Sequence, residues 1–457
     1  MANISMRDSV VLRMCIVAGL GIMLLFPISI ISQLVSERQE TCSTALREVT
    51  EKWGVKQTIT GPILTIPVKY TERVNDETSR VTVQFAHFLP NVLNVNTLIT
   101  PEIRYRGIYR VALYNAQLSA EADFAALRFD GNLASQVEWV RKEASAHVEI
   151  LWKEAFITFG ITDLKGVRKI TGAAADGQPL VAEPGLCTKD LVQTGFTFKM
   201  PLSENQNPGR LKLEMSVNGS EEIRVVPLGR ETKVEMRSAW ASPSFIGDFL
   251  PERREISGES FNATWNVLHW NRNLPQSWTG TQPHLQASSF GVKLLLPVGE
   301  YQKNIRAVKY AVMFIALTFL AFFVIDVLSG SPLHPIHYTL VGLALVLFFV
   351  LLLSVSEHLS FDIAYLIASV AVVLLITMYT RGVTDRWDMA AVVAGILIIL
   401  YGLLFILLQL EDYALLLGSV SLFASLTSVM YLTRRIDWFR LGRAGRSAVV
   451  CPGDKPL

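Results

Sequence analysis

The chain has 457 residues, of which 51% are hydrophobic and only 18% are charged, and its formal net charge at pH 7 is +2. Soluble domains usually carry about a quarter of charged residues. The sequence has no basic stripe with interleaved aromatic residues, so it excludes a nucleic-acid partner. Four cysteines are too few for a disulfide scaffold, although Cys42 and Cys187 could pair if the segment that holds both is exported.

The first apolar stretch covers residues 10–31 and is long enough to cross a bilayer as a helix. It has a basic start and no small-residue cleavage site behind it, so we interpret it as an uncleaved anchor and not as a signal peptide. From Ser32 to Trp53 the apolar spacing is helical, which predicts that the first membrane helix continues as a stalk. Gly54 and the Gly61-Pro62 pair are expected to end it.

Residues 33–305 have the character of a water-soluble, β-rich domain. Short runs of β-branched and aromatic residues, separated by turn signals such as Asn218-Gly219, predict antiparallel strands in a sandwich-like fold. These strands are expected at 63–70, 81–88, 108–118, 147–159, 192–200, 210–217, 222–228, 232–239, 261–269 and 288–297. The length also allows two subdomains with a break near 172–185. The segment 240–251 (WASPSFIGDFLP) is expected to be an ordered loop and not a strand.

From residue 310 to 433 the chain is almost continuously apolar. Several all-apolar helices in succession indicate lipid as their solvent. The predicted spans are 309–328, 338–356, 362–380, 389–410 and 413–433. The predicted fold class is an α+β membrane protein with an N-terminal anchor helix, a large β-rich antiparallel domain and a C-terminal bundle of five transmembrane helices.

The arginines favour one arrangement across the membrane. Arg and Lys near short loops prefer the cytoplasm. Arg7 and Arg13 flank the first span, Arg381 and Arg386 lie between the fourth and fifth, and a basic tail follows the sixth. Six spans with both termini in the cytoplasm place all these groups on one side and make the large domain periplasmic. The predicted domains are a stub with the first helix (1–32), the periplasmic domain (33–305), the bundle (306–433) and the cytoplasmic tail (434–457).

No recognised catalytic motif is present. The sequence has no P-loop, no dinucleotide-binding glycine pattern, no nucleophile elbow and no zinc-ligand spacing. We therefore predict no catalytic residue, no metal site and no cofactor. Asp326, near a helix end, is expected to reach headgroups or water, and His334 and His337 are expected in an exposed loop. The remaining histidines are expected to be packed or surface residues; they are His87, His147, His269 and His284.

One group of ionisable residues does gather at the predicted outer ends of the spans. Three cations face four carboxylates there, and we expect them to neutralise one another. This candidate outer-face polar cluster consists of Lys303, Arg306, Lys309, Glu357, His358, Asp362, Glu411 and Asp412. The alternative is an enzyme that acts on lipids or envelope precursors through His358 with Glu357 or Asp362. A transporter is disfavoured, because none of the spans carries a charge near its midplane.

The chain also resembles the CreD family of inner-membrane proteins over nearly its whole length. The segments that carry the resemblance are Gly61-Pro62, Ile66-Pro67, 243–251, 306–311, Leu317-Thr318-Phe319, Phe322-Phe323, Leu333-His334-Pro335, 340–343, Ser356-Glu357-His358 and 432–438. The resemblance implies an inner-membrane location with six spans, a link to a two-component system and a role in envelope integrity under stress. It implies no catalytic residue.

These observations favour a non-enzymatic envelope protein whose periplasmic domain binds or senses something. Membrane lipids are the expected partners, together with an unidentified periplasmic or membrane partner.

Overall fold

The computed structural model describes residues 10–75, 78–125, 127, 147–204, 206–281, 285–295, 300–329, 334–410 and 414–434. The chain divides into two compact units. One, the helical unit, consists of Met1–Cys42 and Val298–Leu457, and the other, the β unit, consists of Ser43–Pro297.

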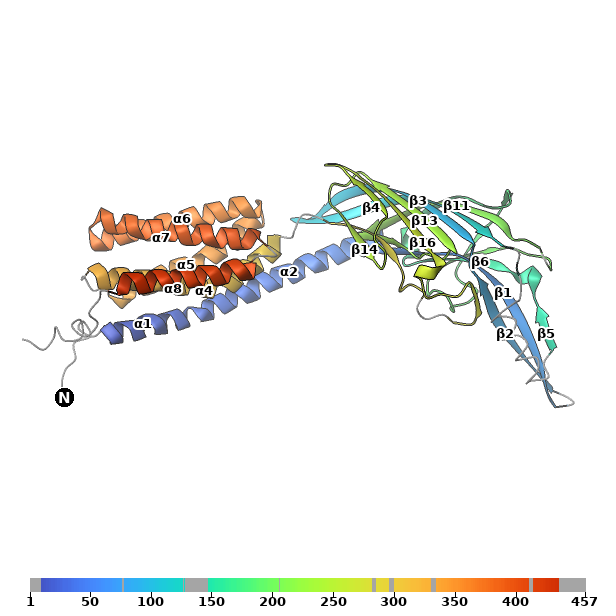
Figure 1. Ribbon diagram of the computed structural model, residues 1–457, viewed down its shortest axis with the longest axis horizontal. Helices are drawn as coiled ribbons and strands as arrows, with labels where there is room; N and C mark the ends of the chain where they lie inside the picture. The colour runs from blue at the N-terminus through green and yellow to red at the C-terminus, as the bar shows by residue number, and fades with distance from the viewer. Residues whose placement is uncertain are drawn as a thin grey trace, which may run out of the picture. The chain divides into compact units, whose positions relative to one another are not determined.

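The helical unit is built from long apolar helices that lie alongside one another (Figure 1). Their bounds are α1 Val10–Met23, α2 Leu25–Trp53, α4 Glu300–Ser329, α5 Pro335–Ser356, α6 Phe361–Thr384, α7 Trp387–Gln409 and α8 Ala414–Thr433. Within the described residues, five helices are long and apolar enough to cross a membrane, and a sixth apolar helix, Leu416–Tyr431, is shorter. The predicted anchor helix and the C-terminal helices are therefore confirmed.

The first two helices follow each other with almost no break. The backbone N–H of Leu24 donates to Leu20, and that of Ile28 donates to Leu24, so helical bonding continues through the junction. The helix continues to Trp53, as the apolar spacing of the stalk predicts, and Gly54 follows it with a positive φ of 143°.

Small residues allow close packing in the bundle. Ala307 and Ala311 of α4 are fully buried. A side chain at Gly342 of α5 would lie 2.3 Å from Leu24 and 2.9 Å from Phe319, so this glycine lets α5 approach its neighbours. By contrast, α8 packs against α4 and α7 and leaves most of its described side chains exposed.

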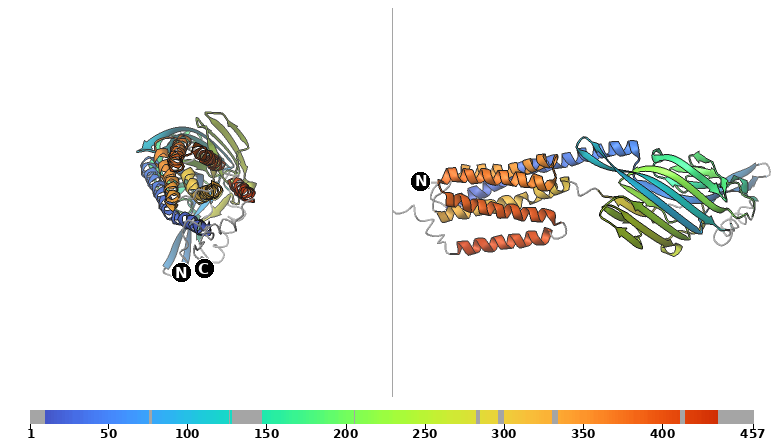
Figure 2. Two further views of the ribbon diagram at one scale, coloured as in Figure 1. Left: turned by 90° about the vertical axis from the view of Figure 1, so that its left-hand side faces the viewer. Right: turned by 90° about the horizontal axis from the view of Figure 1, so that it is seen from above.

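The β unit contains two large sheets (Figures 1 and 2). Sheet A has ten strands, and β1 at its centre pairs with β2, β5, β6 and β12. Its strands are β1 Gln57–Asn75, β2 Thr78–Phe88, β5 His147–Ile150, β6 Phe156–Ile161, β9 Ala182–Pro184, β10 Gly195–Lys199, β12 Glu222–Val225, β14 Pro243–Gly247, β17 Ser277–Thr279 and β18 Phe290–Leu294.

Sheet B has eight strands in the order β15-β16-β13-β3-β4-β11-β7-β8. Its strands are β3 Val92–Arg106, β4 Tyr109–Phe124, β7 Val167–Ala175, β8 Gln178–Pro179, β11 Gly209–Ser220, β13 Glu231–Ser238, β15 Arg253–Ile256 and β16 Phe261–Leu268. Three short 3-10 helices complete the unit, namely η1 Trp152–Glu154, η2 Leu164–Gly166 and η3 His269–Asn271.

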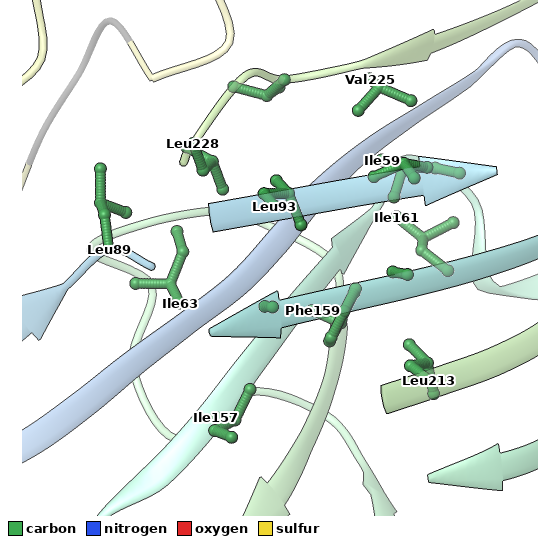
Figure 3. Close-up of a cluster of buried hydrophobic side chains, with 14 of the residues drawn as sticks. Ile59, Ile63, Leu89, Leu93, Ile157, Phe159, Ile161, Leu213, Val225 and Leu228 are labelled. Carbon is green, nitrogen blue, oxygen red and sulfur yellow. The ribbon is translucent and has the colours of Figure 1, made fainter. Parts of the chain in front are cut away.

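One hydrophobic core joins the two sheets. Ile63 and Phe159 of sheet A and Leu93 and Leu213 of sheet B belong to the same buried cluster (Figure 3). Residues Ser43–Pro297 accordingly form one compact unit with a shared core. In the region of the expected break, β7 extends sheet B and β9 extends sheet A, so both parts share the core.

Two local predictions in this unit are wrong. The segment 240–251 contains β14, which pairs only with β18 at one end of sheet A, so the proline at its start costs no ladder bond toward a second neighbour. Phe245 in this strand packs edge-on against Trp265, with ring centroids 5.8 Å apart. The pair Asn218-Gly219 lies inside β11 and not in a turn. The glycine is needed there for packing, since a Cβ at position 219 would lie 2.2 Å from the Tyr114 hydroxyl.

Candidate functional site

Part of the predicted outer-face polar cluster gathers where α4, α6 and α7 meet. Lys303 Nζ lies 3.9 Å from Asp362 Oδ1 and donates to Gln409 Oε1 at 3.3 Å. Gln409 Nε2 in turn donates to Asp362 Oδ1 at 2.5 Å. Lys303 also lies 5.2 Å from the ring centre of Phe361. Gln409 is an uncharged member of this group, and a search for charges alone does not identify it.

The other predicted members have different surroundings. Glu357 pairs with Arg38 at 3.6 Å. Arg306 is half-buried at the same end of α4, whereas Lys309 is exposed. His358 is exposed, and within the described residues it forms no ion pair with Glu357 or Asp362. Glu411 and Asp412 lie outside the described residues.

This geometry offers little to an enzyme mechanism. General acid–base chemistry needs the histidine and a carboxylate within hydrogen-bonding reach of one another or of a shared substrate. Here the two carboxylates are engaged by Arg38, Lys303 and Gln409 instead. In the described part of the chain, no group of three His, Cys, Asp or Glu is placed to hold a metal ion.

The other end of α4 carries an ion pair that the sequence does not reveal. Asp326 is only 2% exposed, and its Oδ2 accepts a hydrogen bond from Arg13 Nη1 of α1 at 3.2 Å. The expectation that Asp326 reaches headgroups or water is therefore wrong. A carboxylate inside apolar helices needs a cation to stay charged, and Arg13 supplies it from 313 positions away along the chain.

The two histidines after α4 differ from each other. His334 is exposed and caps α5, where its side chain accepts a hydrogen bond from Ile336 N at 3.3 Å. His337 lies in the first turn of α5, is half-buried, and its Nδ1 lies 2.7 Å from the Tyr379 hydroxyl. An exposed loop position is thus correct for His334 only.

The β unit has a hollow of about 710 Å³ on sheet B. The residues that line it stand side by side on neighbouring strands. Glu235, Asn96, Ser119 and Glu214 are successive cross-strand partners from β13, β3, β4 and β11. Because side chains alternate along a strand, these residues lie on the face away from the core. The lining consists of Asn96, Thr97, Leu98, Gln117, Leu118, Ser119, Thr171, Glu214, Met215, Ser216, Glu235 and Arg237.

The hollow is lined by both polar and apolar atoms and is almost neutral. Its charged members are paired, Glu235 with Arg237 and Glu214 with Lys212 at 3.1 Å. The remaining polar lining consists of amide and hydroxyl groups. Leu98, which is 50% exposed, and the buried Leu118 and Met215 are its apolar members. Such a surface can donate and accept several hydrogen bonds to a ligand without attracting strong charge of either sign. Five strands distant in sequence contribute to it, so no local motif could have identified it.

A buried histidine in sheet A is structural. His87 has no exposed surface; its Nδ1 lies 3.0 Å from Thr65 Oγ1, and its Nε2 lies 3.7 Å from Asp190 Oδ2. Its ring lies 5.4 Å from that of Trp278. Burial lowers the pKa of His87 to about 4 against the opposing effect of Asp190, so the ring is neutral near pH 7. Thr65 is also fully buried, so this Thr–His–Asp arrangement has no access to a substrate.

The other described histidines of this unit and the cysteines singled out in the sequence lie in separate elements. His147 is exposed in β5 and His269 begins η3, while His284 lies outside the described residues. Cys42, the last residue of the first segment of the helical unit, and Cys187 of the β unit are both free thiols, and Cys187 is exposed.

Comparisons with known proteins agree over almost the full length of the chain. The family described as Inner membrane protein CreD matches residues 9–439. The Inner membrane protein CreD of Escherichia coli (strain K12) is 35% identical over 438 residues, which cover 93% of each chain. A solved M1 zinc metallopeptidase from Deinococcus radiodurans aligns with 49% of this chain and 53% of its own at a TM-score of 0.23 and 8% identity, which is too weak to support any argument.

The family match, the long apolar helices and the β-rich unit between them lead to one identification. This chain belongs to the CreD family and is a multi-pass protein of the inner membrane.

Proposed function

We propose that the β unit lies in the periplasm, that its sheet-B hollow binds an uncharged polar ligand of the cell envelope, and that the protein supports envelope integrity through this binding. The hollow is the observation that carries the proposal. The side-chain amides of Asn96 and Gln117 and the hydroxyl of Ser119 face this volume with no side-chain hydrogen bond to another described residue. The hydroxyls of Thr171 and Ser216 are already bonded, to Glu214 O and to the Asn115 amide. Elsewhere on the same face, exposed charges pair along the strands, as Arg210 does with Asp123 at 2.9 Å.

The periplasmic placement is supported by the distribution of arginine. Arg381 lies in the last turn of α6, Arg386 immediately precedes α7, and further arginines follow α8. Six crossings with these groups in the cytoplasm place residues between the first and second crossings outside. Family membership supports an envelope role, since the Escherichia coli relative bears the name of an inner membrane protein.

The native cysteines provide a direct test of the sidedness. Cys187 is exposed in the β unit, and Cys451 lies in the basic tail. A membrane-impermeant maleimide applied to spheroplasts should label Cys187 in a chain whose other cysteines are serine. A chain that keeps only Cys451 should be labelled after lysis alone. Labelling of Cys451 but not Cys187 in intact spheroplasts would reject the placement.

A second test addresses the hollow. Ser119→Trp places a large side chain in it, whereas Asn266→Trp adds the same ring at an exposed position on β16 outside the hollow. In a strain that lacks the gene, the Asn266 variant should restore tolerance to detergent stress, and the Ser119 variant should not, at equal membrane abundance and equal thermal stability. Equal rescue by both variants would show that the hollow is not the site.

A further inference from the structure

The β3–β4 hairpin ends in a tip that exposes large apolar side chains. Strands β3 and β4 pair without interruption as far as Arg106 and Tyr109, and Gly107-Ile108 forms the turn. At this tip Ile103 is 43% exposed, Tyr105 is 69% exposed and Ile108 is 44% exposed. Exposed apolar residues that are contiguous, and not scattered singly, indicate a contact surface.

The two faces of the hairpin are chemically different. Residues two positions apart on a strand share a face, as do residues directly opposite each other on paired strands. Arg104 and Arg106 therefore lie on one face, where Arg104 sits 4.0 Å above the Trp53 ring and Arg106 donates to Glu48 at 3.3 Å. This face packs on the last turns of α2 and its charges are compensated.

The opposite face is buried at Ala112, but from Ile103 to the tip it is exposed among the described residues and carries no acid. Tyr105 is the direct partner of Arg110, and Ile103 is the partner of the small residue Ala112. Together with Ile108 at the turn, the tip face therefore combines two isoleucines, one tyrosine and one exposed arginine. Tyrosine and arginine both place an apolar body in hydrocarbon and a polar end in water, which is the requirement at a lipid headgroup boundary.

We infer that this tip face, made of Ile103, Tyr105, Ile108 and Arg110, rests in the headgroup region of the bilayer. The connectivity of the chain supports a lipid occupant over a protein one. Both ends of the β unit, at Ser43 and Pro297, lead into the membrane unit, so the bilayer surface is always within reach of the domain. A surface held near lipid binds it at a high effective concentration, so a few apolar side chains suffice. Arg110 interacts with lipid phosphate while the isoleucines enter the acyl boundary.

The test uses the full chain in lipid nanodiscs of phosphatidylethanolamine and phosphatidylglycerol. The four native cysteines are replaced by serine, and one nitroxide is placed by Ile108→Cys. A matched control carries it by Val181→Cys, since Val181 is also β-branched, lies in the same unit and is 79% exposed. Collision rates with oxygen, which partitions into lipid, and with a water-soluble nickel chelate report the surroundings of each label.

The label at position 108 should collide with oxygen more often than with the nickel chelate, and the label at 181 should show the reverse. The ratio of the two rates should fall to the control value when Tyr105 and Ile103 are both replaced by serine. An aqueous ratio at position 108 equal to that at 181 would overturn the inference. Dipolar broadening at 108 that disappears on dilution with unlabelled chain would overturn it too, because it would identify a second copy as the occupant.

Discussion

Arg13 and Asp326 should each stabilise the bundle only while the other is present. The side chains are 18% and 1% exposed, and the charged atoms are 3.2 Å apart. At an effective dielectric constant near 20, Coulomb's law gives an attraction of roughly 5 kcal/mol at this separation. Removal of one partner of a buried pair generally costs about 3–5 kcal/mol, because the other charge is left without compensation. Asp326→Leu and Arg13→Met should therefore each destabilise the protein by about that amount.

The double variant separates this explanation from simple loss of packing. When both charges are removed, no buried ion remains, and an apolar replacement of the pair is often neutral. Unfolding is measured by titration with sodium dodecyl sulfate in mixed micelles. Arg13→Met/Asp326→Leu should recover most of the stability that either single change loses. Arg38→Met provides the matched control, since Arg38 is 49% exposed in its pair with Glu357 and should cost less than about 1 kcal/mol. Additive losses in the double variant would refute the pairing argument.

Three further outcomes are expected. His87 has a pKa of about 4 in the folded chain and 6.5 in the unfolded chain. As the pH falls from 6.5 to 4 only the unfolded chain takes up a proton at His87, so the free energy of unfolding decreases by about 3 kcal/mol in total. His87→Gln should flatten this part of the stability–pH curve. Gly219→Ala should cost about 1–3 kcal/mol because its Cβ would lie 2.2 Å from the Tyr114 hydroxyl, whereas Gly172→Ala, with nothing within 4 Å, should not. Tyr365→Phe should cost about 1 kcal/mol, since the hydroxyl donates to the Tyr401 carbonyl at 2.6 Å.

Each of these expectations has an outcome that contradicts it. If the stability–pH curve of the His87 variant has the same slope between pH 4 and 6.5 as that of the wild type, other groups cause that slope. Equal melting temperatures for the Gly219 and Gly172 variants would mean that β11 can move away from Tyr114. A Tyr365→Phe protein with wild-type stability would mean that the Tyr401 carbonyl finds another donor. Melting temperatures of the purified full chain in detergent report all three.

The large-scale layout follows from residue patterns because its causes are local. Twenty consecutive apolar residues demand lipid, and alternating apolar residues demand a half-buried strand, whatever lies elsewhere. The prediction for 240–251 fails for the opposite reason. Proline, glycine and aromatic residues there resemble a loop, but tertiary contacts decide the matter, since Phe245 finds the rings of Phe261 and Trp265.

Sites are harder to predict than helices for a related reason. In the sequence, Asp326 resembles an acid at the membrane interface, and Arg13 resembles a basic residue that marks the cytoplasmic side. Only the structure shows that the two form an ion pair. The sheet-B hollow depends on register between strands up to 140 positions apart, as the pairing of Glu235 with Asn96 shows. Among the described members of the predicted cluster, Glu357 is directed toward Arg38 and Asp362 toward Lys303 and Gln409. These directions depend on the helix faces, which sequence spacing leaves undetermined.

The polar groups of α4 also suggest how the bundle is positioned in its bilayer. Lys303 and Asp326 are separated by about 35 Å of helix, slightly more than the hydrocarbon thickness of a membrane. Each is held by a different helix of the bundle, Lys303 by Asp362 of α6 and Asp326 by Arg13 of α1. Because a charged group resists movement toward the membrane centre, two such groups at opposite ends of one helix oppose displacement in either direction. The described ion pairs at the two ends of α4 are therefore explained by position in the membrane and by helix pairing.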